Sequence, residues 1–112
     1  MLPENTLAIV ARNERWTGQA ATEPYECGWA REAVFFVRAL AAENLPDFAS
    51  AQVQISPDGM RWADEGTSLL LPSQAGDMEF AKVSHFGGWL RLAVDLPEDA
   101  SMTVVVSLHL KA

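Results

Sequence analysis

The sequence is poor in the residues that form disulfide frameworks, thiolate zinc centres and histidine-dependent active sites. Its 112 residues include one cysteine and two histidines. The single cysteine, Cys27, cannot form an internal disulfide or supply the several thiolates of a structural zinc site. We therefore expect a reduced thiol that behaves as a small apolar side chain, with a disulfide between two molecules or a reactive thiol as the alternatives.

Positive charge and long apolar runs are also scarce. The chain carries 8 Lys and Arg residues against 15 Asp and Glu residues, a formal net charge of -7. General nucleic-acid binding requires a basic face, so no nucleic-acid partner is expected. No run approaches the roughly 18 apolar residues of a membrane-spanning helix, and the N-terminus lacks the basic and long apolar segments of a signal peptide. These absences predict synthesis in the cytoplasm and no membrane partner.

No complete catalytic or metal-binding set is recognisable. His85 and His109 are accompanied by no nucleophile-elbow motif, and Gly87 and Gly88 lack the lysine and helix context of a phosphate-binding loop. Several carboxylates lie at predicted turns without a calcium-binding spacing, namely Asp58, Asp64, Glu65, Asp77 and Glu79. The sequence therefore predicts no enzymatic activity, no cofactor and no metal site.

Alternation of apolar and polar residues is the strongest positive signal. Hydrophobic residues make up 49% of the chain, too many for intrinsic disorder, and the length suits one domain over residues 1–112. Turn residues separate short alternating or apolar segments about every 8–12 positions. These segments are residues 7–12, 51–56, 61–65, 68–71, 78–85, 89–96 and 102–111. The pattern predicts an all-β domain, an antiparallel β-sandwich or jelly roll of about seven to eight strands.

Turn chemistry predicts two hairpins. Pro57-Asp58-Gly59 is typical of a tight turn and predicts that residues 51–56 pair with residues 61–65. Turn-forming residues between 89–96 and 102–111 predict that these two segments pair as well.

Residues 30–43 and 13–28 do not alternate simply. Residues 30–43 fit either an alanine-rich amphipathic helix or a strand with two apolar faces. We favour the strand because its centre, Val34-Phe35-Phe36-Val37, is β-branched and aromatic. Residues 13–28 are predicted to form a long loop, a place where function is often found.

Aromatic residues mark candidate contact sites. The chain has four tryptophans, and Trp16 and Trp29 flank the predicted loop together with Tyr25. These three rings are candidate contacts for a ligand or partner. Trp89 and Arg91 share one face of a predicted strand, and they form a second contact surface if that face is exposed. The alternative is that the indoles close the ends of the sandwich.

Several strands are apolar on both faces. Val105 lies opposite Val104 and Val106, and Ala93 lies opposite the leucines of its strand. Antiparallel sheets commonly keep one face in water. A second apolar face therefore predicts burial against another subunit.

The segment Ser56-Pro-Asp-Gly-Met-Arg-Trp62 resembles the hairpin of discoidin-like jelly rolls and other bacterial and phage sandwich modules. In that hairpin a serine-x-aspartate-glycine turn precedes a tryptophan, here Ser56, Asp58, Gly59 and Trp62. The segment is also similar to the aspartate box of sialidases, although that motif has one more residue between aspartate and glycine. Residues 51–96 as a whole look like small proteins encoded near phage-type structural genes. The resemblance implies a particle-associated β-sandwich and supplies no catalytic residue.

These observations predict a non-enzymatic structural protein. It would be a self-associating subunit or decoration protein of a phage-like particle, a virion or another assembly, with itself or other subunits as partners. The alternative is a carbohydrate-binding module that contacts a glycan through Trp16, Tyr25 and Trp29. An accessory subunit of an enzyme is a third hypothesis.

Overall fold

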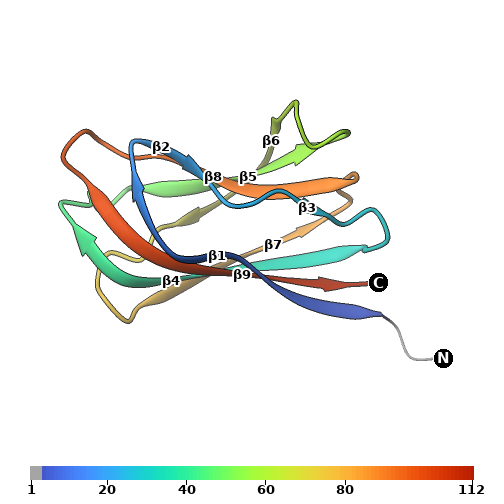
Figure 1. Ribbon diagram of the computed structural model, residues 1–112, viewed down its shortest axis with the longest axis horizontal. Helices are drawn as coiled ribbons and strands as arrows, with labels where there is room; N and C mark the ends of the chain where they lie inside the picture. The colour runs from blue at the N-terminus through green and yellow to red at the C-terminus, as the bar shows by residue number, and fades with distance from the viewer. Residues whose placement is uncertain (1–3) are drawn as a thin grey trace.

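Nine antiparallel strands form two sheets in the computed structural model, which describes residues 4–112 (Figure 1). The strands are β1 (Asn5–Thr17), β2 (Gln19–Ala21), β3 (Tyr25–Glu26), β4 (Glu32–Glu43), β5 (Ser50–Ser56), β6 (Ala63–Leu70), β7 (Met78–Ser84), β8 (Trp89–Asp95) and β9 (Ser101–Lys111). One sheet has the order β1-β9-β4-β7, and the other has the order β2-β8-β5-β6, with β3 also paired to β8. The predicted all-β sandwich is confirmed.

The strand order is that of a jelly roll. The strands β2 and β3 both pair with β8 and together occupy one position in the five-stranded sheet. Apart from the links β2–β3 and β5–β6, each connection crosses from one sheet to the other. No helix within the described residues is long and apolar enough to cross a membrane.

The two predicted hairpins have different outcomes. The pairing of β5 with β6 is confirmed, from Ser50 opposite Leu70 to Ile55 opposite Ala63. The pairing of β8 with β9 is wrong, because these strands belong to different sheets. Both strands alternate because each turns one face toward the same core. Leu96 and Ala100 in the connection are buried, so this segment closes one end of the sandwich instead of forming a hairpin turn.

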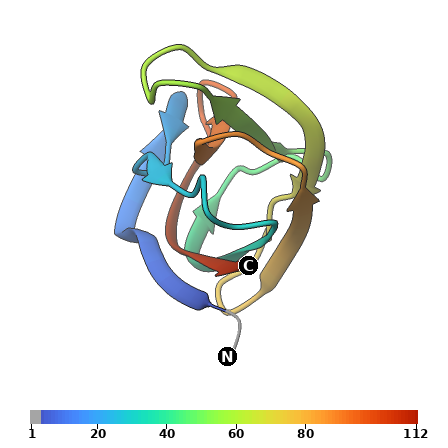
Figure 2. The ribbon, with the colours of Figure 1, turned by 90° about the vertical axis from the view of Figure 1, so that its right-hand side faces the viewer.

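The core lies between the two sheets and is built from the inward positions of the long strands. Its largest contribution comes from β9, with Met102, Val104, Val106, Leu108 and Leu110 all fully or nearly fully buried. The strand β8 faces these residues from the other sheet with Leu90, Leu92 and Val94. Seen from the end where β1 begins and β9 finishes, the sheets face each other across this core (Figure 2).

Residues 30–43 form a strand, as favoured, and the helix alternative is wrong. The strand β4 is central, between β9 and β7. Phe35 and Val37 point into the core, while Val34 and Phe36 are half-buried on the opposite side. Both faces are apolar because both have packing neighbours on two flanking strands.

The prediction of a long loop over residues 13–28 is wrong. The strand β1 continues to Thr17, and most of the remaining segment forms β2 and β3. The register of β1 against β9 shifts between Ile9 and Ala11 and again between Ala11 and Glu14. Each bulge changes which residues face inward, so a continuous strand loses its simple alternation in the sequence.

Candidate interaction surfaces

The outer face of the four-stranded sheet carries an apolar band that crosses all four strands. Directly paired residues project their side chains to the same side of a sheet. The register places Ile9 beside Ser107, Ser107 beside Phe36, and Phe36 beside Phe80. We call this band the outer apolar face and define it as Leu7, Ile9, Val34, Phe36, Met78, Phe80 and Val105.

The outer apolar face is well packed at its centre and exposed at its borders. The ring centroid of Phe36 lies 5.9 Å from that of Phe80 and 5.0 Å from that of His109. On the border strands, Leu7 is 59% exposed and Phe80 is 54% exposed. Isolated surface leucines are ordinary, but contiguous apolar patches mark interaction sites. The face extends from the free edge of β1 to the free edge of β7.

Basic side chains accompany this face although the chain is acidic. Arg38 is paired with Met78 and Val105, and Lys82 is paired with Val34. Lys111 is paired with Asn5 and with Glu32, whose carboxylate lies on the same side. Three basic side chains and the carboxylate of Glu32 therefore lie on or beside the apolar face.

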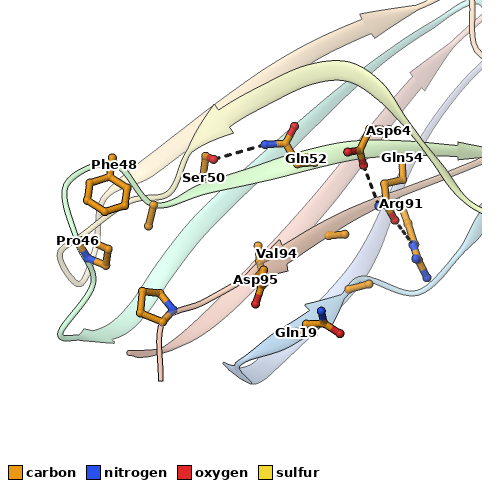
Figure 3. A pocket seen from close by; sticks show the side chains of 15 residues that line it. Gln19, Pro46, Phe48, Ser50, Gln52, Gln54, Asp64, Arg91, Val94 and Asp95 are labelled. Carbon is orange, nitrogen blue, oxygen red and sulfur yellow. Dashed lines mark hydrogen bonds between the residues drawn. The ribbon is translucent and has the colours of Figure 1, made fainter. Parts of the chain in front are cut away.

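The outer face of the five-stranded sheet is polar and hollowed. It holds a groove of about 650 Å³ lined by residues of β2, β5, β6 and β8 together with Pro46, Phe48 and Pro97 (Figure 3). Three register partners on adjacent strands form a chain of hydrogen bonds across it. The Nε group of Arg91 donates to Oε1 of Gln54 over 2.8 Å, and Nε2 of Gln54 donates to Oδ1 of Asp64 over 2.9 Å. The guanidinium carbon of Arg91 lies 4.3 Å from the ring centroid of Trp62, a cation–π contact.

The predicted turn motif lies at one end of this sheet and has a structural role. The hydroxyl of Ser56 accepts hydrogen bonds from the amides of Asp58 and Gly59 and donates to Oδ1 of Asp58. That oxygen accepts from the amides of Met60 and Arg61, and the Arg61 guanidinium binds Oδ2 over 3.0 Å. These hydrogen bonds, led by the Arg61 amide, lower the pKa of Asp58.

Gly59 explains why the turn packs against a tryptophan. Its φ of 79° is in the left-handed region that favours glycine. A Cβ at this position would lie 3.2 Å from Cδ2 of Trp89. The β5–β6 hairpin thus brings together six residues that the sequence predicted, namely Ser56, Asp58, Gly59, Trp62, Trp89 and Arg91. Of these, Trp89 packs against the turn at Gly59, and Arg91 lines the groove.

The three rings predicted to form a contact site do not form one. Trp16 is 1% exposed, so the prediction that it contacts a ligand is wrong, and its Nε1 has no acceptor among the described residues. Tyr25 packs against the core from β3. Trp29 alone is exposed, within the turn in which the amide of Ala30 donates to the carbonyl of Cys27. Because β1 extends to Thr17, Trp16 is paired with the buried Met102 of β9 and points to the same side of the sheet, into the core.

Cys27 is buried, which agrees with a reduced thiol. Its Sγ contacts the carbonyl oxygen of Gly87 at 3.8 Å. Burial, aided by the charge of Glu26, raises the pKa of the thiol to about 11. Within residues 4–112, no group of three metal-ligating side chains is found.

Sequence reasoning named Val105 but missed the other residues of the outer apolar face, and it missed the partners of Arg91. Leu7, Phe36 and Phe80 belong to three separate segments, and only the strand order brings them together. The apolar character of both strand faces was the available signal. Gln54 and Asp64 could have been found from the confirmed β5–β6 hairpin, since they are register partners in it.

Comparisons with known proteins identify the fold. No protein-family model and no curated protein matches the chain. The solved structure of SPBc2 prophage-derived protein YomS matches with a TM-score of 0.66 and 12% identity, covering 100% of this chain and 96% of that one. PBSX exported protein XepA matches with a TM-score of 0.59 and 11% identity, covering 99% of this chain and 37% of that one. At such identities the likeness establishes that this chain shares their fold.

Proposed function

We propose that this chain is a structural protein of a phage-type particle and that it self-associates through the outer apolar face. The observation that carries the proposal is the apolar band across β1, β9, β4 and β7. The sandwich already has a complete core between its sheets, so this second apolar surface serves no purpose inside one molecule. The shared fold with a prophage-derived protein over nearly the full length of both chains supports the phage setting.

The partner that fits this face best is a second copy of the same chain. Arg38, Lys82 and Lys111 flank the apolar residues, and Glu32 lies on the same side of the sheet, so a second copy that presents the same face offers a carboxylate to these basic side chains. Complementary charge fixes orientation and speeds encounter, whereas apolar burial supplies most of the affinity. A subunit of this kind assembles without a cofactor and without a catalytic site.

Light scattering on a sizing column tests the proposal. We expect a discrete oligomer of the 12.2 kDa chain that persists at high salt, because apolar contacts are not screened by ions. Phe80→Ser is the diagnostic variant. Complete burial of such a side chain contributes about 1.5–3 kcal/mol, and about half of Phe80 remains to be buried. The variant should therefore weaken association about tenfold or less per contact, and Leu7→Ser combined with it should weaken association further.

Leu70→Ser is the matched control, because Leu70 is similarly exposed at 58% but lies on β6 of the other sheet. It should leave the mass unchanged. A monomer of 12.2 kDa at every concentration would overturn the proposal. Equal loss of association in Leu70→Ser and Phe80→Ser would show that the contact lies elsewhere.

A further inference from the structure

The floor of the groove on the five-stranded sheet is formed by small side chains, and longer polar side chains surround it. Ala21 of β2 is paired with Ala93 of β8, and Ala93 is paired with Gln52 of β5. Two adjacent methyl groups leave a depression where longer side chains would fill the surface. The groove therefore follows from the sequence of the outward positions and requires no unusual backbone.

Arg91 stands in this groove with part of its hydrogen-bonding capacity unused. Its Nε is committed to Gln54, and its guanidinium plane is placed over Trp62. Its Nη1 and Nη2 groups have no acceptor within the described part of the chain. No carboxylate forms an ion pair with Arg91 there; the nearby ion pair joins Arg61 to Asp58. Partial burial lowers the pKa of Arg91. A held guanidinium with two free amino groups suits a carboxylate.

The remainder of the groove suits hydroxyl groups. Gln19, Gln52 and Asp95 line it along β2, β5 and β8, and Figure 3 shows these side chains spread along the groove. Phe48, which is 78% exposed, stands at the end opposite Arg91 with Pro46 beside it. Planar amides and carboxylates bind hydroxyls, and an exposed ring stacks on the apolar face of a sugar.

The charges in the groove restrict the ligand to one carboxylate. Asp64 lies beyond Gln54 on one side of Arg91, and Asp95 lies farther along β8. A ligand with many negative charges would place some of them next to these carboxylates, which would be unfavourable. A neutral chain with a single acidic unit avoids this repulsion.

We propose that this groove binds an oligosaccharide that carries one carboxylate, with the carboxylate on Arg91 and neutral sugar units directed toward Phe48. The site lies on the sheet opposite the outer apolar face. Glycan binding and self-association can therefore succeed or fail independently.

A glycan array with paired probes tests this proposal. Each single-carboxylate oligosaccharide, of the uronic, sialic and muramic acid types, is printed beside its neutral form in which the carboxyl is reduced to an alcohol. We expect at least one acidic probe to bind, its reduced form to bind at least tenfold more weakly, and Arg91→Ala to lose the difference. Arg91→Lys should recover binding only in part, because lysine lacks the bidentate fork.

Two further variants keep the test independent of folding. Ala93→Gln fills the floor of the groove without touching the core and should abolish binding while the melting temperature changes little. Arg61→Ala removes an exposed arginine of the neighbouring hairpin and should bind like the wild type. Equal binding of acidic and reduced probes, or binding unchanged in Arg91→Ala and Ala93→Gln, would overturn the proposal. So would an array without any bound probe.

Discussion

The burial of the Trp16 indole near the end of β1 can be tested directly by substitution. The indole is buried at 1% exposure, and its Nε1 has no acceptor among residues 4–112. Trp16→Ala removes the whole ring and should lower the free energy of unfolding by about 3–5 kcal/mol. Trp16→Phe removes two ring carbons, which costs about 1.6 kcal/mol at roughly 0.8 kcal/mol per buried carbon. It also removes an unpaired buried N–H group whose burial costs about 1–3 kcal/mol.

The two terms for Trp16→Phe nearly cancel, so this variant should unfold within about 1.5 kcal/mol of the wild type. Urea unfolding followed by far-ultraviolet circular dichroism measures both variants without depending on the altered fluorophore. The linear extrapolation is valid if both retain the wild-type m-value. A loss in Trp16→Phe as large as that in Trp16→Ala would refute the reasoning, because it would mean that Nε1 makes a strong hydrogen bond in the folded protein.

Three further predictions concern the turn and the thiol. Gly59→Ala should destabilise the fold by about 1–2 kcal/mol from its positive φ and further through contact with Trp89. Gly18→Ala, whose Cβ meets nothing within 4 Å, should show only the first effect in thermal melts; equal losses would exclude the contact. Because the pKa of Asp58 is lowered in the folded state, its stabilising contribution should be present above the unfolded pKa of about 3.9 and disappear as the pH falls further. Asp58→Asn should reduce the loss of unfolding free energy below this pH, and an unchanged loss would contradict the role assigned to Asp58. The Cys27 thiol, with its pKa raised to about 11, should resist iodoacetamide at pH 8 until the protein is unfolded by guanidinium; rapid labelling of the native protein would contradict its burial.

Strand formation could be predicted from the sequence because it depends on neighbouring residues. In β9, Met102 and Val104 face the core and Thr103 faces outward, and a period of two records that arrangement directly. The β5–β6 hairpin was also predictable, because the conformations of Pro57 and Gly59 set the turn locally. The same local signals gave the wrong partner for β8, since turn residues are needed both for hairpins and for crossings between sheets.

The candidate sites depend on long-range pairing and were only partly predictable. The sequence predicted Arg91 as a contact residue, but the surroundings of its side chain depend on Gln54 and Trp62, which lie outside its own strand. Trp16 was misassigned because bulges in β1 change the phase of a strand that otherwise alternates.

The sequence by itself determined that this protein is an all-β sandwich with a single cysteine, an acidic net charge and more apolar strand faces than one core requires. These properties follow from composition and local periodicity, which neighbouring residues set. Only the tertiary structure decided that β9 lies between β1 and β4, so that Ile9, Phe36 and Phe80 form one band. It also decided that Arg91 faces the groove and has no ion-pair partner among residues 4–112. The physical reason is that strand order and register are fixed by the simultaneous packing of all strands around one core, which no local segment records.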